Sequence, residues 1–64
     1  MPWNKEKYER VAFNTFRSLH KGIDSPEYFI KAHAKDIKME EYESAKAIRD
    51  VLKQFDIDVK ILTK

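Results

Sequence analysis

The chain has 64 residues and a net charge of +2, with 42% hydrophobic and 38% charged residues. This length allows one small domain, residues 1–64, and so weak a net charge does not by itself indicate a nucleic-acid binder. Because the chain contains no cysteine, disulfides, zinc–thiolate sites and thiol nucleophiles are excluded.

The chain lacks the sequence marks of membrane insertion or secretion. No apolar run approaches the roughly 18 residues of a membrane span, and the first five residues, MPWNK, lack the apolar centre of a signal peptide. We therefore expect a soluble, cytoplasmic protein. A core of this size gives only a few kcal/mol of stability, so self-association or a protein partner is also expected.

The first predicted helix covers residues 5–21. Asn4 is a good N-cap, and Gly22 suits the left-handed position that ends a helix. Apolar and small residues recur every three or four positions, which predicts one buried stripe. This stripe consists of Tyr8, Val11, Ala12, Thr15, Phe16, Leu19 and Ile23.

The opposite side of this first helix carries cations at helical spacing. A cationic ridge flanked by an aromatic ring is typical of surfaces that bind phosphate and stack a base. The alternative is a solvated face, which every amphipathic helix requires. The candidate anion or nucleic-acid ligands are Lys7, Arg10, Phe13, Asn14, Arg17 and Lys21.

The second predicted helix begins at Pro26 and ends near Lys35 or Ile37. Ser25 is its N-cap, and proline is favoured in the first helical position. The spacing of Ile30, Ala34 and Ile37 predicts its buried side.

A histidine and two acids lie near the end of this second helix. His33 and Asp36 are three positions apart, and Glu40 joins them if the helix continues, which is a spacing found in metal sites. A histidine beside buried residues is also a common hydrogen-bonded boundary residue. We favour the second interpretation and expect neither a metal nor any other cofactor.

The third predicted helix runs from about Lys38 to Phe55. Asp36 either caps this helix or lies in a kink that joins it to the second one. We expect ion pairs of Lys46 with Glu43 and Asp50. The predicted buried seam consists of Ala45, Ile48, Leu52 and Phe55, widened by Ala47 and Val51.

The last segment, residues 56–64, alternates polar and β-branched residues, which favours an extended, β-like tail. A continuing helix is the alternative. A single strand has no partner within this chain, so the tail would pair with a second copy or with another protein. The whole pattern predicts an all-α fold of three helices, a helical hairpin preceded by an N-terminal helix, with this tail.

The segment EYESAKAIRD, residues 41–50, resembles the UVR motif of the bacterial excision-repair proteins UvrB and UvrC. That motif is a helical hairpin for protein–protein contact, and its first helix would correspond to residues 28–37. Part of the pattern, from Ala45 to Leu52, also looks like the C-terminal region of cysteinyl-tRNA synthetases. The residues that carry the UVR resemblance are Tyr42, Glu43, Ala45, Ile48, Arg49, Asp50 and Leu52.

The function that we expect is non-catalytic: a small protein-interaction module, an accessory or inhibitor that docks on a larger protein and associates with itself. Two histidines in separate elements and no glycine-rich phosphate loop argue against an enzyme. The expected contact residues are Met39, Tyr42 and Arg49, on the outer side of the UVR-like helix. Nucleic-acid or nucleotide-phosphate binding by the cationic ridge is the alternative function.

Overall fold

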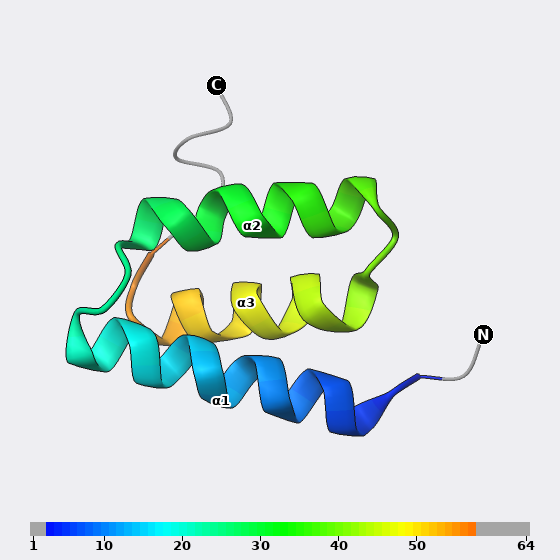
Figure 1. The fold of residues 1–64 in the computed structure, drawn as a ribbon, viewed down its shortest axis with the longest axis horizontal. Coiled ribbons are helices and arrows are strands. Elements are labelled where there is room, and N and C mark those ends of the chain that lie inside the picture. Colours follow the sequence, from blue (N-terminus) through cyan, green and yellow to red (C-terminus); the bar gives the residue numbers. More distant parts are fainter. Residues whose placement is uncertain (1–2, 58–64) are drawn as a thin grey trace.

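Three helices form the part of the chain that the computed structural model describes, residues 3–57, and this confirms the all-α prediction (Figure 1). They are α1 (Lys5–Lys21), α2 (Pro26–Lys38) and α3 (Tyr42–Gln54). The chain reverses direction at each of the two turns between them. Helix α3 packs against both α1 and α2, whereas α1 and α2 have little direct contact.

The first two helices begin at the predicted caps. The side-chain oxygen of Asn4 accepts a hydrogen bond from the Lys7 amide at 3.0 Å. The hydroxyl of Ser25 accepts one from the Tyr28 amide at 3.4 Å, and Pro26 occupies the first turn of α2. Each cap satisfies an amide that has no partner inside its helix.

Each helix is followed by a residue in the left-handed conformation: Gly22 (φ 71°), Glu40 (φ 61°) and Asp56 (φ 60°). In all three places the next amide bonds back to the carbonyl five residues earlier, which closes the last turn. Glu40 therefore ends α2 and separates it from α3. The predictions that the third helix begins at Lys38, or joins the second through a kink, are wrong.

The core is centred on α3. The seam predicted for this helix is confirmed, with only Phe55 half-buried. Phe29 and Ile30 of α2 pack against Ile48 and Leu52. Partly buried apolar residues from the other elements complete the cluster, namely Val11, Leu19, Ala32 and Ile57.

Four side chains that the spacing placed in the core are exposed. Phe16 is 43% exposed, because it lies at the edge of the α1–α3 contact, where its ring meets Phe55 at 5.4 Å. Ile23 is 65% exposed in the turn after α1. On α2, Ala34 and Ile37 are exposed because this helix turns Phe29 toward the core instead.

The predicted tail lies mostly outside the described residues. Asp56 is left-handed rather than extended, and Ile57 packs against the core, so these two residues do not begin a strand. Residues 58–64 are not described. Within residues 3–57, none of the helices has the length and apolar character needed to cross a bilayer.

Candidate functional site

Apolar side chains gather around the turn between α2 and α3. Met39 is 62% exposed, Tyr42 53% and Ile37 46%. Arg49 is also exposed, and it shares a face of α3 with Tyr42 because seven residues make nearly two full turns. We call Ile37, Met39, Tyr42 and Arg49 the α2–α3 surface. Helix α2 therefore leaves the three predicted contact residues accessible.

Sequence reasoning missed Ile37 as a member of this surface. Its spacing from Ile30 assigned it to the core, and the left-handed turn at Glu40 was not recognised. The nearby His33 is half-buried on α2. Burial and, secondly, the cation of Arg49 lower the pKa of His33 below its ordinary value, whereas Asp36 opposes the shift.

The lowered pKa of His33 predicts a pH dependence of stability. Below the ordinary histidine pKa of 6.5, the unfolded chain binds more protons than the folded one, so the free energy of unfolding should fall as the pH drops. Urea unfolding at about pH 7.5 and about pH 5.5 measures this loss. His33→Gln should reduce the difference between the two conditions, and an unchanged difference would refute this role of His33.

The cationic ridge of α1 is only partly available. Arg10, Phe13, Asn14, Arg17 and Lys21 are exposed, as the ridge requires, and Phe13 is 64% exposed. Lys7, in contrast, forms an ion pair with Glu41, which raises the pKa of Lys7. Lys7 thus differs from the other cations of the ridge in being paired with a carboxylate.

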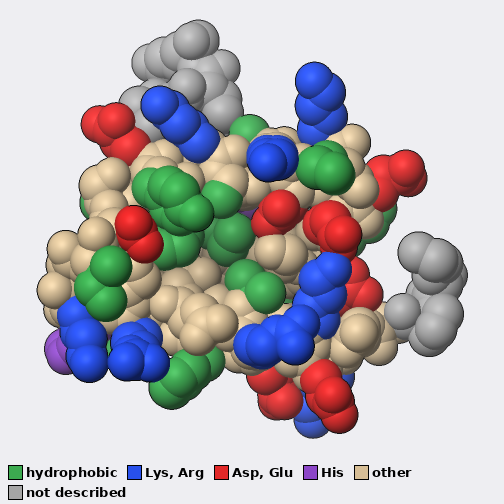
Figure 2. Space-filling model, viewed as in Figure 1, with side chains coloured by type: hydrophobic (Ala, Val, Ile, Leu, Met, Phe, Trp, Pro, Cys, Tyr) green, Lys and Arg blue, Asp and Glu red, His purple; other side chains and the backbone are tan. Residues whose placement is uncertain are grey.

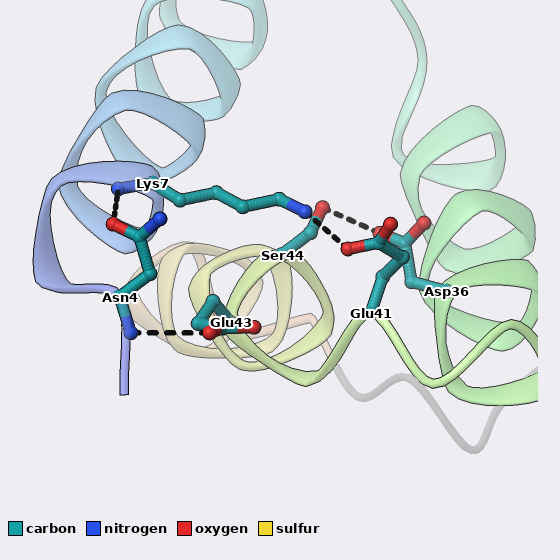
Figure 3. A network of polar contacts seen from close by, with 6 residues as sticks. All are labelled: Asn4, Lys7, Asp36, Glu41, Glu43 and Ser44. Carbon is teal, nitrogen blue, oxygen red and sulfur yellow. Dashed lines mark hydrogen bonds and ion pairs between the residues drawn. The ribbon is translucent and has the colours of Figure 1, made fainter. Parts of the chain in front are cut away.

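Polar contacts connect the start of α1 to the α2–α3 turn (Figure 3). Lys7 reaches Glu41, and the Asn4 amide donates to the Glu43 carboxylate at 3.1 Å. A bond from the backbone of Glu43 itself and, secondly, this bond from Asn4 lower the pKa of Glu43. The expected Glu43–Lys46 ion pair is absent from the described residues, whereas the Lys46 Nζ and an Asp50 carboxylate oxygen lie 3.6 Å apart as expected.

A groove of about 370 Å³ lies between α1 and α2, with α3 as its floor (Figure 2). Two serine–aspartate contacts lie along it. The Ser18 hydroxyl donates to Asp24 at 2.9 Å, and the Ser44 hydroxyl donates to Asp36 at 2.6 Å. Other lining residues are Val11, Asn14, Thr15, Tyr28, Phe29, Ala32 and Ile48. No sequence pattern indicated this groove, because it depends on how far apart α1 and α2 lie.

The metal-site spacing at the end of the second helix does not produce a cluster. Asp36 is bonded to Ser44, and Glu40 lies in the turn after α2. Between residues 3 and 57, no three histidine, aspartate or glutamate side chains converge as a metal site requires. The other histidine, His20, stacks on Phe16 with ring centroids 5.9 Å apart.

The described surfaces are therefore an apolar patch at the α2–α3 turn, a shortened cationic ridge and a groove beside that ridge. The first suits contact with a protein, and the second suits contact with an anion. Comparison of the chain with protein families, with curated proteins and with solved structures finds no match.

Proposed function

We propose that this chain is a small, non-catalytic, cytoplasmic interaction module that docks on a larger protein through the α2–α3 surface. The observation that carries the proposal is the exposure of Ile37, Met39 and Tyr42 around one turn. Leaving such side chains in water forgoes part of the hydrophobic stabilisation of a small fold. A partner that covers them recovers this free energy.

The chemistry of the surface supports a protein partner. Tyrosine, methionine and arginine are enriched at protein interfaces, and tyrosine and arginine often dominate their binding energy. Methionine adapts its flexible side chain to an irregular surface. Tyr42 and Arg49 are held on one rigid helix, which reduces the entropy lost on binding.

Three further features agree with this proposal. Helices α2 and α3 form a hairpin, which is the form that the UVR resemblance implies, and α3 begins at Tyr42. Both histidines take part in packing, His20 against Phe16 and His33 at the α2–α3 boundary. A chain without cysteine also suits the cytoplasm.

Substitutions on the surface should abolish capture of the partner. We expect Met39→Ser with Tyr42→Ser to reduce the amount of protein retained by the tagged chain by roughly tenfold or more. Quantitative mass spectrometry of proteins captured from extracts of the native cells measures this loss. Phe13→Ser with Ile23→Ser is the matched control, because it removes two equally exposed apolar side chains elsewhere.

The outcome of this comparison distinguishes the surfaces. Circular dichroism should show both variants folded, since all four positions are exposed. Partners that are lost only with the Met39 and Tyr42 substitutions support docking through the α2–α3 surface. Equal retention by both variants and the wild type would refute it.

The second candidate function is nucleic-acid binding by the ridge, and the exposure of Phe13 between Arg10 and Arg17 favours it. Pairing of Lys7 with Glu41 weakens it, because one of the four cations is then occupied. Nuclease treatment before capture separates the two candidates. Partners that depend on nucleic acid would disappear from the wild-type sample, and the Met39 and Tyr42 substitutions would not matter.

A further inference from the structure

The groove between α1 and α2 is open and could accommodate a further helix. Helix α3 packs against both neighbours, but α1 and α2 have little direct contact, so the third side of the bundle is open. Apolar groups of Val11, Phe29 and Ile48 reach the groove. Figure 2 shows the hollow between the two outer helices.

The charged groups that line this groove are acidic. Asp24 lies near one end and Asp36 near the other, and no lysine or arginine is among the lining residues. Each carboxylate accepts a hydrogen bond from a serine. A neutral hydroxyl leaves the negative charge uncompensated, so the groove suits an occupant with two separated cations.

The cationic ridge borders the same groove. Asn14 belongs to the ridge and also lines the groove, so Arg10, Arg17 and Lys21 follow the edge that α1 contributes. Within residues 3–57, none of these three cations forms an ion pair. An acidic groove and the cationic side of α1 therefore lie next to each other on the same chain.

The cations of α1 and the acids of the groove are separated by similar distances. At 1.5 Å per helical residue, Arg10 and Lys21 are separated by about 16 Å along α1, and Asp36 lies about 15 Å along α2 from Pro26. Asp24 lies in the turn just before α2. Helices α1 and α2 run in opposite directions. The Lys21 end of α1 therefore lies level with Asp24, and its Arg10 end lies toward Asp36.

We propose that the occupant of this groove is α1 of a second copy, in a dimer with a two-fold axis parallel to α1. In this arrangement the Lys21 end of each copy lies level with Asp24 of the other, and the Arg10 end lies toward Asp36. The contact is reciprocal, as a two-fold interface requires. It uses a surface separate from Met39 and Tyr42, so the dimer and the docked partner are compatible.

A second copy explains the observations better than an unrelated cationic segment does. Both complementary halves are present on one chain, at matching separations. Covering Val11, Tyr28 and Ala32, which line the groove and are not buried in the single chain, would also enlarge a core that is small for independent folding. The dimer should weaken as salt is added, because the cations lie at the exposed edge of the groove.

Charge exchange tests the proposal by sedimentation velocity of the purified full chain at micromolar concentrations. The wild type should sediment as a dimer. Arg10→Glu with Lys21→Glu places acids against acids, and Asp24→Lys with Asp36→Lys places cations against cations. Each variant alone should dimerise roughly tenfold or more weakly. An equimolar mixture should form a heterodimer, because both of its contacts are again complementary.

Controls separate charge pairing from loss of folding. Lys31→Glu with Lys53→Glu changes the net charge equally at two exposed positions away from the ridge and should leave the dimer intact. If the lysine variant fails to fold, Asp24→Asn with Asp36→Asn keeps both serine contacts and should still weaken the dimer. A monomeric wild type, a mixture of folded variants that does not associate, or a dimer that both folded charge variants preserve would overturn the proposal.

Discussion

Leu52→Ala is expected to lower the free energy of unfolding by about 2–5 kcal/mol, the usual cost of emptying a packed leucine site. Leu52 is fully buried, and it lies in the cluster with Phe29, Ile30 and Ile48. A chain of 64 residues has a total stability of roughly 3–10 kcal/mol. The variant should therefore lose much of its helical signal at room temperature.

Thermal and urea unfolding, followed by circular dichroism, measure this loss. Ile48→Ala should behave similarly, because Ile48 belongs to the same cluster. Phe13→Ala is the control, since Phe13 is 64% exposed and its truncation creates no cavity. A Leu52→Ala protein that melts like the wild type would show that α3 is not the centre of the core.

Ala47→Leu should destabilise the fold by about 1–3 kcal/mol through overpacking. Ala47 is completely buried, and it lies on α3 between Glu43 and Asp50. These two neighbours contact α1: Glu43 accepts from the Asn4 amide, and Asp50 accepts from the Tyr8 hydroxyl at 2.5 Å. A small residue at position 47 therefore allows α1 and α3 to approach closely.

The same substitution at an exposed position isolates the effect of packing. Ala34→Leu introduces the identical side chain on the exposed side of α2 and should change the unfolding free energy little. Urea unfolding of the two variants under one condition gives the comparison. If the Ala47→Leu variant were as stable as the Ala34→Leu variant, this would contradict the close approach of α1 and α3 at Ala47.

Those helix termini that carry strong local signals could be predicted from the sequence. Asn4, Gly22 and the Ser25–Pro26 pair act within one helical turn, so their effect does not depend on the rest of the fold. The end of α2 could not be predicted in this way. Its left-handed residue is Glu40, and glutamate gives no indication of that conformation.

The buried side of a helix was predictable only where one apolar stripe dominates. On α3 a single stripe runs from Ala45 to Leu52, and it is buried as expected. Helix α2 offers two choices, one through Ile30 and Ile37 and another through Phe29 and Ala32. Packing against α3 selects a position that buries Phe29 and Ile30 and exposes Ile37.

The residues of the candidate site could also be predicted only in part from the sequence. Met39, Tyr42 and Arg49 were predicted as contact residues because their spacing places them off the buried seam of the third predicted helix. Pairing of Lys7 with Glu41 and the serine–aspartate contacts of the groove join residues from different helices. Such contacts depend on tertiary distances, which a periodic pattern does not contain.

Site-specific photocrosslinking tests the proposed docking surface most directly. A photoreactive phenylalanine analogue is placed at position 42, at position 13 on the ridge, or at position 54, the exposed end of α3. The proposed function predicts that only position 42 gives a strong crosslink to a protein other than a second copy of the chain in native cells, and that the crosslink survives nuclease treatment. A crosslink to nucleic acid from position 13, with none from position 42, would contradict it.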